Sequence, residues 1–202
     1  TPRATENFCT RLDANIAKLQ QKVGEREGKL GEKRTERQGK IDTRQGNRDT
    51  TREDHRDTWD TNRGEMFGKL EARATTTEQK AAVAAFKSAV DAAVTARRTA
   101  VDKAVADYRA ALDKAIVDRQ AAVDAAAAAF KTAREAAIAT AKADCAGGKT
   151  PSEVRTTFMA SMKAAQDALK ASVKALEGRK DTVTPLAAAR KADVEKAVAD
   201  FK

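Results

Sequence analysis

The two cysteines, Cys9 and Cys145, are the side chains of this sequence best suited to covalent or metal chemistry. A zinc site needs several cysteines or histidines at short spacing, and the chain has one histidine and no C-x-x-C or C-x-x-H pair. Two cysteines without further ligands are compatible with a disulfide in an oxidising compartment. We therefore expect a structural disulfide rather than a metal centre or a catalytic thiol.

The remaining chemical motifs are weak. His55 lies between Asp54 and Arg56, among charges that water should solvate. Residues 60–64 with Glu71 contain some ligands of a calcium loop, but the glycine comes one place early and the fifth place has no carboxylate. We find no glycine-rich phosphate loop and no serine elbow. The sequence therefore predicts no enzymatic activity, no catalytic residue, no cofactor, no metal and no small-molecule substrate.

Long helices would have to position these residues. From Ala81 to Ala146 the chain divides into six units of eleven residues: AAVAAFKSAVD, AAVTARRTAVD, KAVADYRAALD, KAIVDRQAAVD, AAAAAFKTARE and AAIATAKADCA. Eleven residues in three turns keep one apolar stripe on one face of a helix. Alanine beside this stripe favours the helix and allows close packing. With aromatic residues at only 4%, the pattern predicts an all-α fold with narrow seams rather than a globule with a bulky core.

The first arm of the chain, residues 1–74, has the same period but a polar middle. Phe8, Leu19, Leu30 and Ile41 are each eleven apart. Between Asp42 and Glu65, Trp59 is the only large apolar residue. If the spacing of three, four and four continues, the predicted seam consists of Gln45, Arg48, Arg52, Arg56, Trp59, Arg63, Phe67 and Leu70.

Turn residues divide the chain. Thr75 and Glu78 can form a capping box, Gly147 and Gly148 can end a helix, and Pro151 suits a first helical position. Thr184-Pro185 should break or kink a helix. We predict a single elongated domain, 1–202, with a long helix over 1–74, a turn over 75–79, a long helix over 80–146, a turn over 147–151, a helix over 152–182 and a short helix over 185–202. These segments would form an antiparallel hairpin whose third helical segment packs back to give a three-helix rod.

The cysteine positions fit this hairpin. Thr77, in the predicted turn, is 68 residues from Cys9 and 68 from Cys145. Because the rise per residue is the same in both helices, the two sulfurs return to the same end of the hairpin. We therefore predict a Cys9–Cys145 disulfide.

The third segment is too short to cover the whole hairpin. In a straight antiparallel register Lys202 falls near Thr95, so the turn end would be two helices thick. Two interpretations of the apolar residues there stay open: a small local cluster, or a contact site for another copy or another protein. We call these residues the tip cluster: Trp59, Met66, Phe67, Leu70, Val83, Phe86 and Val90.

The arginines of the first arm also have two interpretations. Their stems can lie on the alanine-rich partner helix while the guanidinium groups reach aspartates, with Arg63 near Asp91 and Arg52 near Asp102. Alternatively, they form a stripe displayed to nucleic acid, lipopolysaccharide or an acidic polymer. We call these residues the arginine stripe: Arg48, Arg52, Arg56 and Arg63.

Charge and the first residues bear on location. The net charge of +9 is spread as +3 over 1–74, +2 over 75–146 and +4 over 147–202, which is typical of an interspersed surface. The sequence begins Thr1-Pro2-Arg3, without an initiator methionine, and has no apolar run of membrane-spanning length. We expect an extracytoplasmic protein, secreted, on the cell surface or in the periplasm, whose signal peptide has been removed.

Two resemblances complete the interpretation. Phe8-Cys9, the charged first arm, Glu78-Gln79-Lys80 before the Ala-Val repeats and the run Ala143-Asp144-Cys145-Ala146 resemble uncharacterised secreted coiled-coil proteins of Patescibacteria-type bacteria. The long-armed basic hairpin is similar in architecture to the periplasmic Skp/OmpH-type holdase chaperones.

Three functions follow, in order of preference. The first is a secreted structural or interaction protein that forms a homo-oligomer or a surface filament or sheath. The second, suggested by the chaperone resemblance, is a holdase or other binding module with a protein client. The third is a protein that binds an anionic surface polymer.

Overall fold

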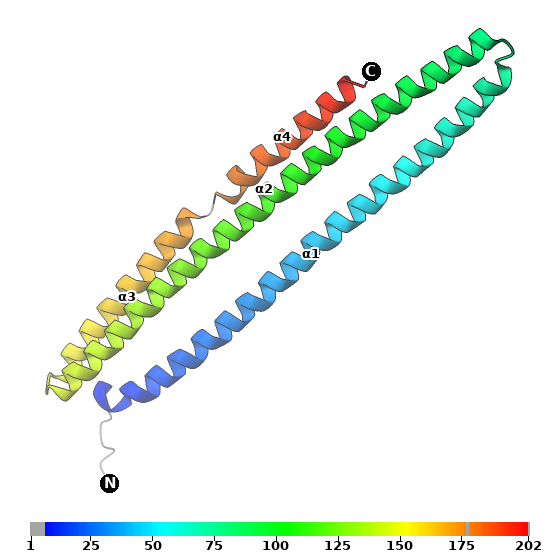
Figure 1. Cartoon of the computed structure of the whole chain (residues 1–202). Coiled ribbons are helices and arrows are strands. Elements are labelled where there is room, and N and C mark those ends of the chain that lie inside the picture. Colours follow the sequence, from blue (N-terminus) through cyan, green and yellow to red (C-terminus); the bar gives the residue numbers. More distant parts are fainter. Residues whose placement is uncertain (1–6, 177, 202) are drawn as a thin grey trace. The chain divides into compact units, whose positions relative to one another are not determined.

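The computed structural model describes residues 7–176 and 178–201, and these residues form helices and turns without any strand (Figure 1). The helices are α1 (Phe8–Arg73), α2 (Thr77–Ala146), α3 (Pro151–Ala175) and α4 (Arg179–Ala199). The predicted all-α fold is confirmed. Residues 1–6, 177 and 202, which we had included in predicted helices, lie outside the described residues. None of the described helices combines the length and the apolar character needed to cross a membrane.

Contacts divide the chain into two units, which we treat separately. Unit 1 combines Thr1–Arg26 with Ala106–Arg190, and unit 2 combines Glu27–Val105 with Lys191–Lys202.

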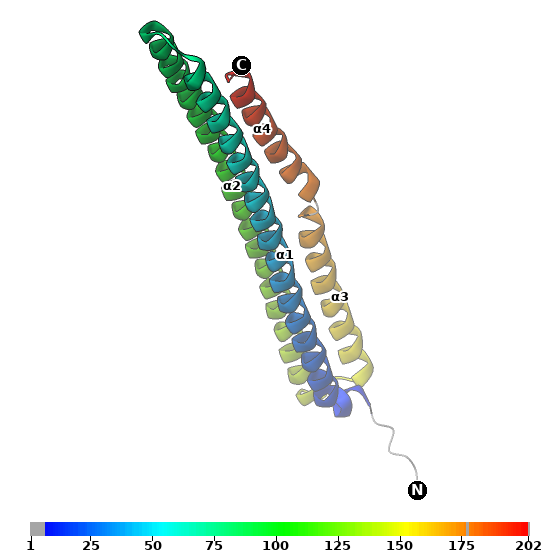
Figure 2. The ribbon, with the colours of Figure 1, turned by 90° about the vertical axis from the view of Figure 1, so that its right-hand side faces the viewer.

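Unit 1 is a small bundle of helical segments around an apolar core. Leu12 and Ile16 of α1, Ala141 of α2 and Val154 of α3 are buried together. The rings of Phe8 and Phe158, from α1 and α3, lie 5.7 Å apart beside this core. α3 follows the turn after α2 and runs back along the hairpin (Figures 1 and 2), and Val154 of α3 is buried with Ala141 of α2. The eleven-residue stripes therefore provide a core for three helical segments in this unit.

The turn between α2 and α3 follows the sequence closely. Gly148 has a φ of 79°, the left-handed conformation that glycine adopts without strain, just after α2 ends. Thr150 caps α3: its hydroxyl oxygen accepts a hydrogen bond from the Glu153 amide at 3.3 Å, and the Glu153 carboxylate accepts one from the Thr150 amide at 3.1 Å. Pro151 occupies the first helical position. These bonds satisfy amides that the helix itself leaves unpaired.

The turn in unit 2 is capped one residue later than the sequence predicted. α1 ends at Arg73 and α2 begins at Thr77. The Thr76 hydroxyl accepts a hydrogen bond from the Gln79 amide at 3.2 Å, and the Gln79 side-chain oxygen accepts bonds from the amides of Thr75 and Thr76 at 2.8 and 3.2 Å. The capping box therefore uses Thr76 with Gln79 rather than Thr75 with Glu78. Three successive threonines can each cap, and the Gln79 side chain reaches two amides at once.

Of the two outcomes predicted at Thr184-Pro185, a break or a kink, the break is wrong. α3 ends at Ala175, α4 begins at Arg179, and Pro185 lies inside α4. Gly178 takes the position before α4, where its carbonyl accepts a hydrogen bond from the Thr182 amide at 3.2 Å. Glycine is a poor residue for a helix interior and is tolerated at a cap, whereas proline removes one hydrogen bond of the helix. The chain is therefore interrupted at the glycine.

Candidate functional site: a charged ladder and an exposed apolar surface

Unit 2 holds α1 and α2 together partly through charge. Arg63 Nε lies 3.2 Å from Asp91 Oδ1, and Arg52 Nε lies 3.5 Å from Asp102 Oδ1. Both contacts were predicted from the antiparallel register and are confirmed. Arg52 and Arg63 are eleven residues apart, as are Asp91 and Asp102, so the two pairs repeat with the period of the helices.

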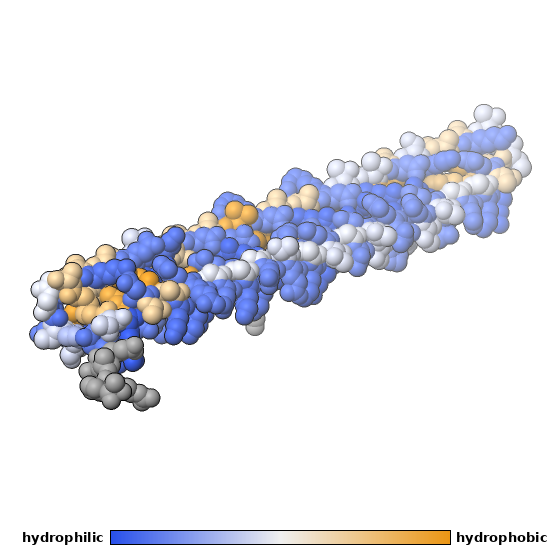
Figure 3. All heavy atoms as spheres, turned by 90° about the horizontal axis from the view of Figure 1, so that it is seen from below, coloured by the Kyte–Doolittle hydropathy of each residue, from blue (hydrophilic) through white to orange (hydrophobic). Residues whose placement is uncertain are grey.

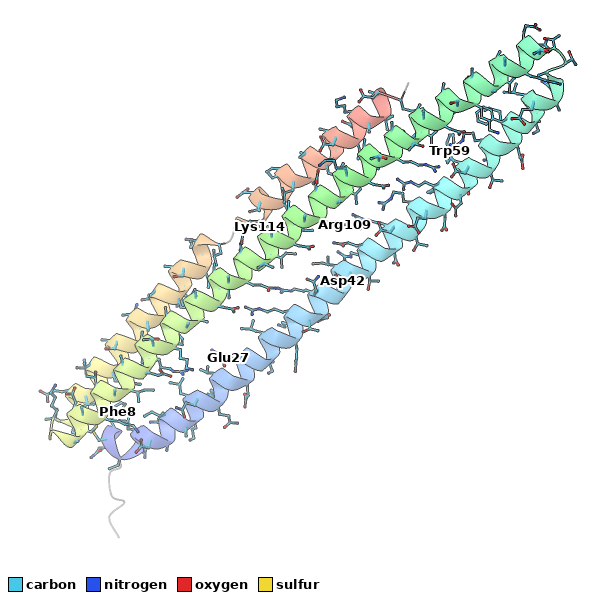
Figure 4. The ribbon with its side chains drawn as sticks, in the orientation of Figure 1. Phe8, Glu27, Asp42, Trp59, Arg109 and Lys114 are labelled. Carbon is cyan, nitrogen blue, oxygen red and sulfur yellow. A yellow bond between two sulfur atoms is a disulfide. The ribbon has the colours of Figure 1, made fainter. Side chains whose placement is uncertain are left out.

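A second set of pairs has the opposite polarity. The Arg98 guanidinium of α2 donates to both carboxylate oxygens of Asp60 in α1, at 2.9 and 2.6 Å. One repeat nearer the turn, Lys87 Nζ lies 3.3 Å from Glu71 Oε1. Figure 4 shows side chains of α1 and α2 that reach toward one another along this part of the hairpin. We call the four pairs, Arg63–Asp91, Arg52–Asp102, Arg98–Asp60 and Lys87–Glu71, the charged ladder.

Arg56 strengthens one rung of this ladder. Its two terminal nitrogens donate to the two carboxylate oxygens of Asp102, at 3.0 and 2.7 Å. A planar guanidinium that meets both carboxylate oxygens is the strongest common form of side-chain ion pair. Asp102 therefore contacts Arg56 and Arg52 of the same helix face.

Ion pairs shift the pKa values of three members of the ladder, Asp102, Asp60 and Arg98. The hydrogen bond from Arg56 and its positive charge hold the pKa of Asp102 below the ordinary value, against a smaller opposing effect of burial. Arg98 lowers the pKa of Asp60 in the same way, and Asp60 in turn raises the pKa of Arg98. In each case the partner stabilises the charged form. These groups stay ionised at neutral pH and serve as ion pairs rather than as acids or bases.

The seam of α1 differs from the one we predicted. Asp49 and Asp60 are half-buried where we expected Arg48 and Trp59, and these last two are exposed. The cause is charge pairing, because Arg52 contacts Asp49 at 2.8 Å and Arg98 contacts Asp60. Guanidinium groups between two helices need carboxylates beside them. The spacing held a clue, since Asp49, Asp60 and Glu71 are each eleven residues apart.

The arginine stripe is therefore mostly paired within the unit. Arg52, Arg56 and Arg63 each contact an aspartate of α2, and their side chains are only 28%, 23% and 23% exposed. Arg48 is exposed. The first of our two interpretations, in which the stems cover the partner helix and the heads reach aspartates, describes these three residues.

The tip cluster divides into a buried part and an exposed part. Phe67 is 2% exposed, and its ring meets that of Phe86 edge-on at 5.9 Å. The Lys87 ammonium lies 5.8 Å from the centre of the Phe67 ring. Leu70, Val83 and Val90 are half-buried. A local core therefore exists around Phe67.

Three members of the tip cluster face solvent. Trp59 is 70% exposed, Phe86 is 51% exposed and Met66 is 41% exposed. Trp59 and Met66 are seven residues apart and so lie on nearly the same side of α1, next to the charged ladder. The interpretation of the tip as a purely internal cluster does not account for these three side chains.

The end of α4 covers only part of α2 within unit 2. Arg97 of α2 lies over the ring of Phe201, 5.0 Å from its centre, and Ala104 and Ala197 are buried. Phe86 occupies the same place in the eleven-residue repeat as Arg97, one unit nearer the turn. The face of α2 that contacts Phe201 therefore continues toward the turn. Phe86 is the exposed residue on this continuation.

Unit 1 contains the disulfide. The structure joins Cys9 of α1 to Cys145 of α2, the pair that the sequence predicted, with their Cα atoms 5.8 Å apart. The bond flanks the core of Leu12, Ile16 and Val154. Nearby, Lys142 Nζ contacts Asp13 Oδ1 at 2.7 Å.

The other chemical candidates are not brought together. His55 is exposed, and Asp60 and Glu71 of the loop-like segment contact Arg98 and Lys87 instead of each other. Among the described residues no group of three or more histidine, cysteine, aspartate or glutamate side chains could hold a metal ion.

No family model, curated protein or solved structure matches the chain.

Proposed function

We propose that this protein is a non-enzymatic, secreted structural or interaction protein that self-associates, with an extracellular or cell-surface filament or sheath as the assembled form. The observation that carries the proposal is the exposure of Trp59, Phe86 and Met66 on unit 2. A disulfide is compatible with an extracytoplasmic location.

The composition of this exposed surface supports a protein contact. Tryptophan is among the residues that contribute most to binding energy at protein interfaces, and methionine adapts its shape to a partner. Single exposed apolar side chains need no explanation, but here a tryptophan, a phenylalanine and a methionine lie on two adjacent helices.

A second copy is the partner we favour. Each copy carries helices with the same eleven-residue period, so their alanine-rich stripes match in spacing. A symmetric pair requires a surface that complements itself. The exposed residues Trp59, Phe86 and Met66 are apolar, and the nearby carboxylates and guanidinium groups are already paired with each other. A copy therefore meets little unpaired charge on this surface.

Light scattering coupled to size-exclusion chromatography, over a wide range of protein concentration, tests the proposal, with negative-stain microscopy to detect filaments. We expect the wild-type mass to rise with concentration. The double substitution Trp59→Ser and Phe86→Ser should restore a monomer.

The matched control is the pair Val117→Ser and Met159→Ser, because these residues are also exposed, at 61% and 56%, and belong to unit 1. The control should associate like the wild type. A monodisperse wild-type monomer at high concentration, or equal loss of association in both double variants, would contradict the proposal.

A holdase is the second candidate, favoured by the same exposed aromatic and methionine side chains, which could contact an unfolded client. Suppression of the aggregation of an unfolded outer-membrane protein would support it. No suppression at a stoichiometric excess would exclude it.

The polyanion-binding alternative is less favoured because Arg52, Arg56 and Arg63 contact aspartates. It requires binding to DNA or acidic polysaccharide that weakens steeply with salt.

A further inference from the structure

A groove lies between α1 and α3 at the end of unit 1 where both helices begin. Its volume is about 540 Å³, within the range of small-molecule sites. The lining residues come from the first turns of the two helices: Asn7, Phe8, Arg11, Leu12, Asn15, Ile16, Leu19, Arg155, Phe158 and Met159. Figure 3 shows apolar side chains gathered at this end of the face, next to the beginning of α1.

The groove has an apolar floor. Leu12 and Ile16 form its buried part, and Phe8, Leu19 and Phe158 are half-buried. Met159 is 56% exposed at the edge. The apolar residues of α1, at positions 8, 12, 16 and 19, follow one face of the helix, so the floor is long and narrow. A linear hydrocarbon chain fits this shape better than a compact ring system.

The polar part of the lining is positive. Arg11 and Arg155 line the groove, and no lining residue is acidic. Arg155 is exposed and forms no ion pair with any described residue. The charge of the groove therefore favours an anionic ligand.

We propose that this groove binds an anionic amphiphile, a linear hydrocarbon chain that ends in a carboxylate. The hydrocarbon chain covers the half-buried Leu19 and Phe158 and the exposed Met159, and the carboxylate is bound by the guanidinium group of Arg155. A fatty acid and an N-acyl amino acid, whose carboxylate belongs to the amino acid, share this chemistry. The proposal uses residues of unit 1 and is independent of self-association through unit 2.

Titration calorimetry of the full, oxidised chain with dodecanoate, below its micelle concentration, tests the proposal. We expect saturable binding of one dodecanoate. Dodecyltrimethylammonium, with the same chain and opposite charge, should bind at least tenfold more weakly, as should butyrate, which has the same head and little chain. Binding of acyl-glycine with the same chain length would show that an acylated molecule is also accepted.

Two substitutions at exposed positions test the residues. Arg155→Gln should weaken dodecanoate binding by about fivefold to tenfold and leave binding of dodecanol unchanged. Met159→Asp should weaken both ligands. The matched controls in unit 2, Arg48→Gln and Leu30→Asp, also change exposed residues and should bind like the wild type.

Circular dichroism will confirm that each variant is folded. No saturable binding of dodecanoate up to 1 mM, equal affinity for the anionic and cationic ligands, or equal loss in the unit 2 controls would each overturn the proposal.

Discussion

The guanidinium group of Arg98 in α2 holds both carboxylate oxygens of Asp60 in α1, at 2.9 and 2.6 Å, across the hairpin of unit 2. A helix pair usually buries leucine or valine at such a position, and here a fork-shaped ion pair takes their place. The neighbouring rungs pair opposite charges through single contacts at the same eleven-residue interval. Packing and charge therefore specify the same register in this unit.

The fork geometry of this pair can be tested with a conservative change. Arg98→Lys keeps the charge but loses the two parallel hydrogen bonds, so the variant should unfold at a lower urea concentration than the wild type. Arg97→Lys is the matched control on the neighbouring residue, which lies over the Phe201 ring instead of a carboxylate. Equal unfolding midpoints for Arg98→Lys and the wild type would show that the fork contributes nothing.

Arg56 and Asp102 should be energetically coupled. A double-mutant cycle with Arg56→Gln and Asp102→Asn isolates their interaction, and we expect about 0.5–1 kcal/mol, because both side chains remain partly exposed. Urea unfolding followed by circular dichroism provides the four stabilities. The exposed pair Lys163–Asp167 within α3 is the control, and its cycle should give a smaller coupling. A larger coupling there would refute the idea that the interhelical position matters.

Stability should decrease in acid. The folded state lowers the pKa values of Asp102 and Asp60 below the ordinary 3.8, so it favours their ionised forms. Their contribution to the free energy of unfolding is complete when the pH is above their pKa in the unfolded chain. It is lost as the pH falls through their lower pKa in the folded protein. We expect similar urea midpoints at pH 7 and pH 5.5 and a lower midpoint below about pH 4. Asp102→Asn should reduce this decrease, and an identical pH profile in wild type and variant would argue against the assignment.

The disulfide should make a large contribution to the free energy of unfolding. Cys9 and Cys145 are 136 residues apart, and cross-linking a loop of that size restricts the unfolded chain by about 4–5 kcal/mol in the chain-entropy model. Replacing both cysteines with serine should lower stability by up to that amount. Mass measurement of the native protein with and without reduction checks the bond itself. Two free thiols in the native protein would contradict this part of the structure.

Phe67 and Phe86 should behave differently although their rings touch. Phe67→Ala empties a fully buried site and should cost about 3–5 kcal/mol of unfolding free energy. Phe86→Ala removes a ring that is 51% exposed, so its cost should be much smaller. Thermal and urea unfolding provide both values. If Phe86→Ala were as damaging as Phe67→Ala, Phe86 would belong to the core and could not serve as a contact surface.

Pro185 should destabilise α4 from within. It cannot donate a hydrogen bond to the Asp181 carbonyl, and Pro185→Ala should restore this bond and stabilise the helix by up to about 3 kcal/mol. Hydrogen exchange along residues 183–199 should slow in the variant. Thr184→Ala, on the preceding residue, should have a smaller effect because it changes helix propensity alone. Unchanged exchange in Pro185→Ala would mean that the helix does not continue through this position.

The repeat made much of the fold predictable. Spacing of apolar and alanine residues indicated the long helices, and the antiparallel register that brings Cys9 level with Cys145 also placed Arg63 beside Asp91. The caps were less predictable, because Thr75, Thr76 and Thr77 compete for one position. We placed the helix boundary at Pro185, whereas the structure places it at Gly178. Both residues disfavour helices, and the balance between them depends on local hydrogen bonds.

The surfaces were harder to predict than the helices. The hydrophobic pattern assigned Trp59 to the seam, but Asp60 occupies that position because it pairs with Arg98 of the other helix, and the indole is exposed. Whether Trp59 or Asp60 lies in the seam therefore depends on residues of both helices. The groove of unit 1 also escaped the sequence, because Phe8, Leu12 and Ile16 look like ordinary core positions until the spacing between α1 and α3 is known.

The charged ladder has a consequence for how this hairpin can change in length. Arg52 and Arg63 on one helix, and Asp91 and Asp102 on the other, recur at the same interval. Removing one whole repeat from each arm at matching levels would leave the remaining rungs opposite one another and the turn intact. Removing a repeat from one arm alone would shift every rung beyond the deletion by three helical turns. The hairpin is thus modular, and insertions or deletions should be tolerated in matched steps of one repeat on both arms.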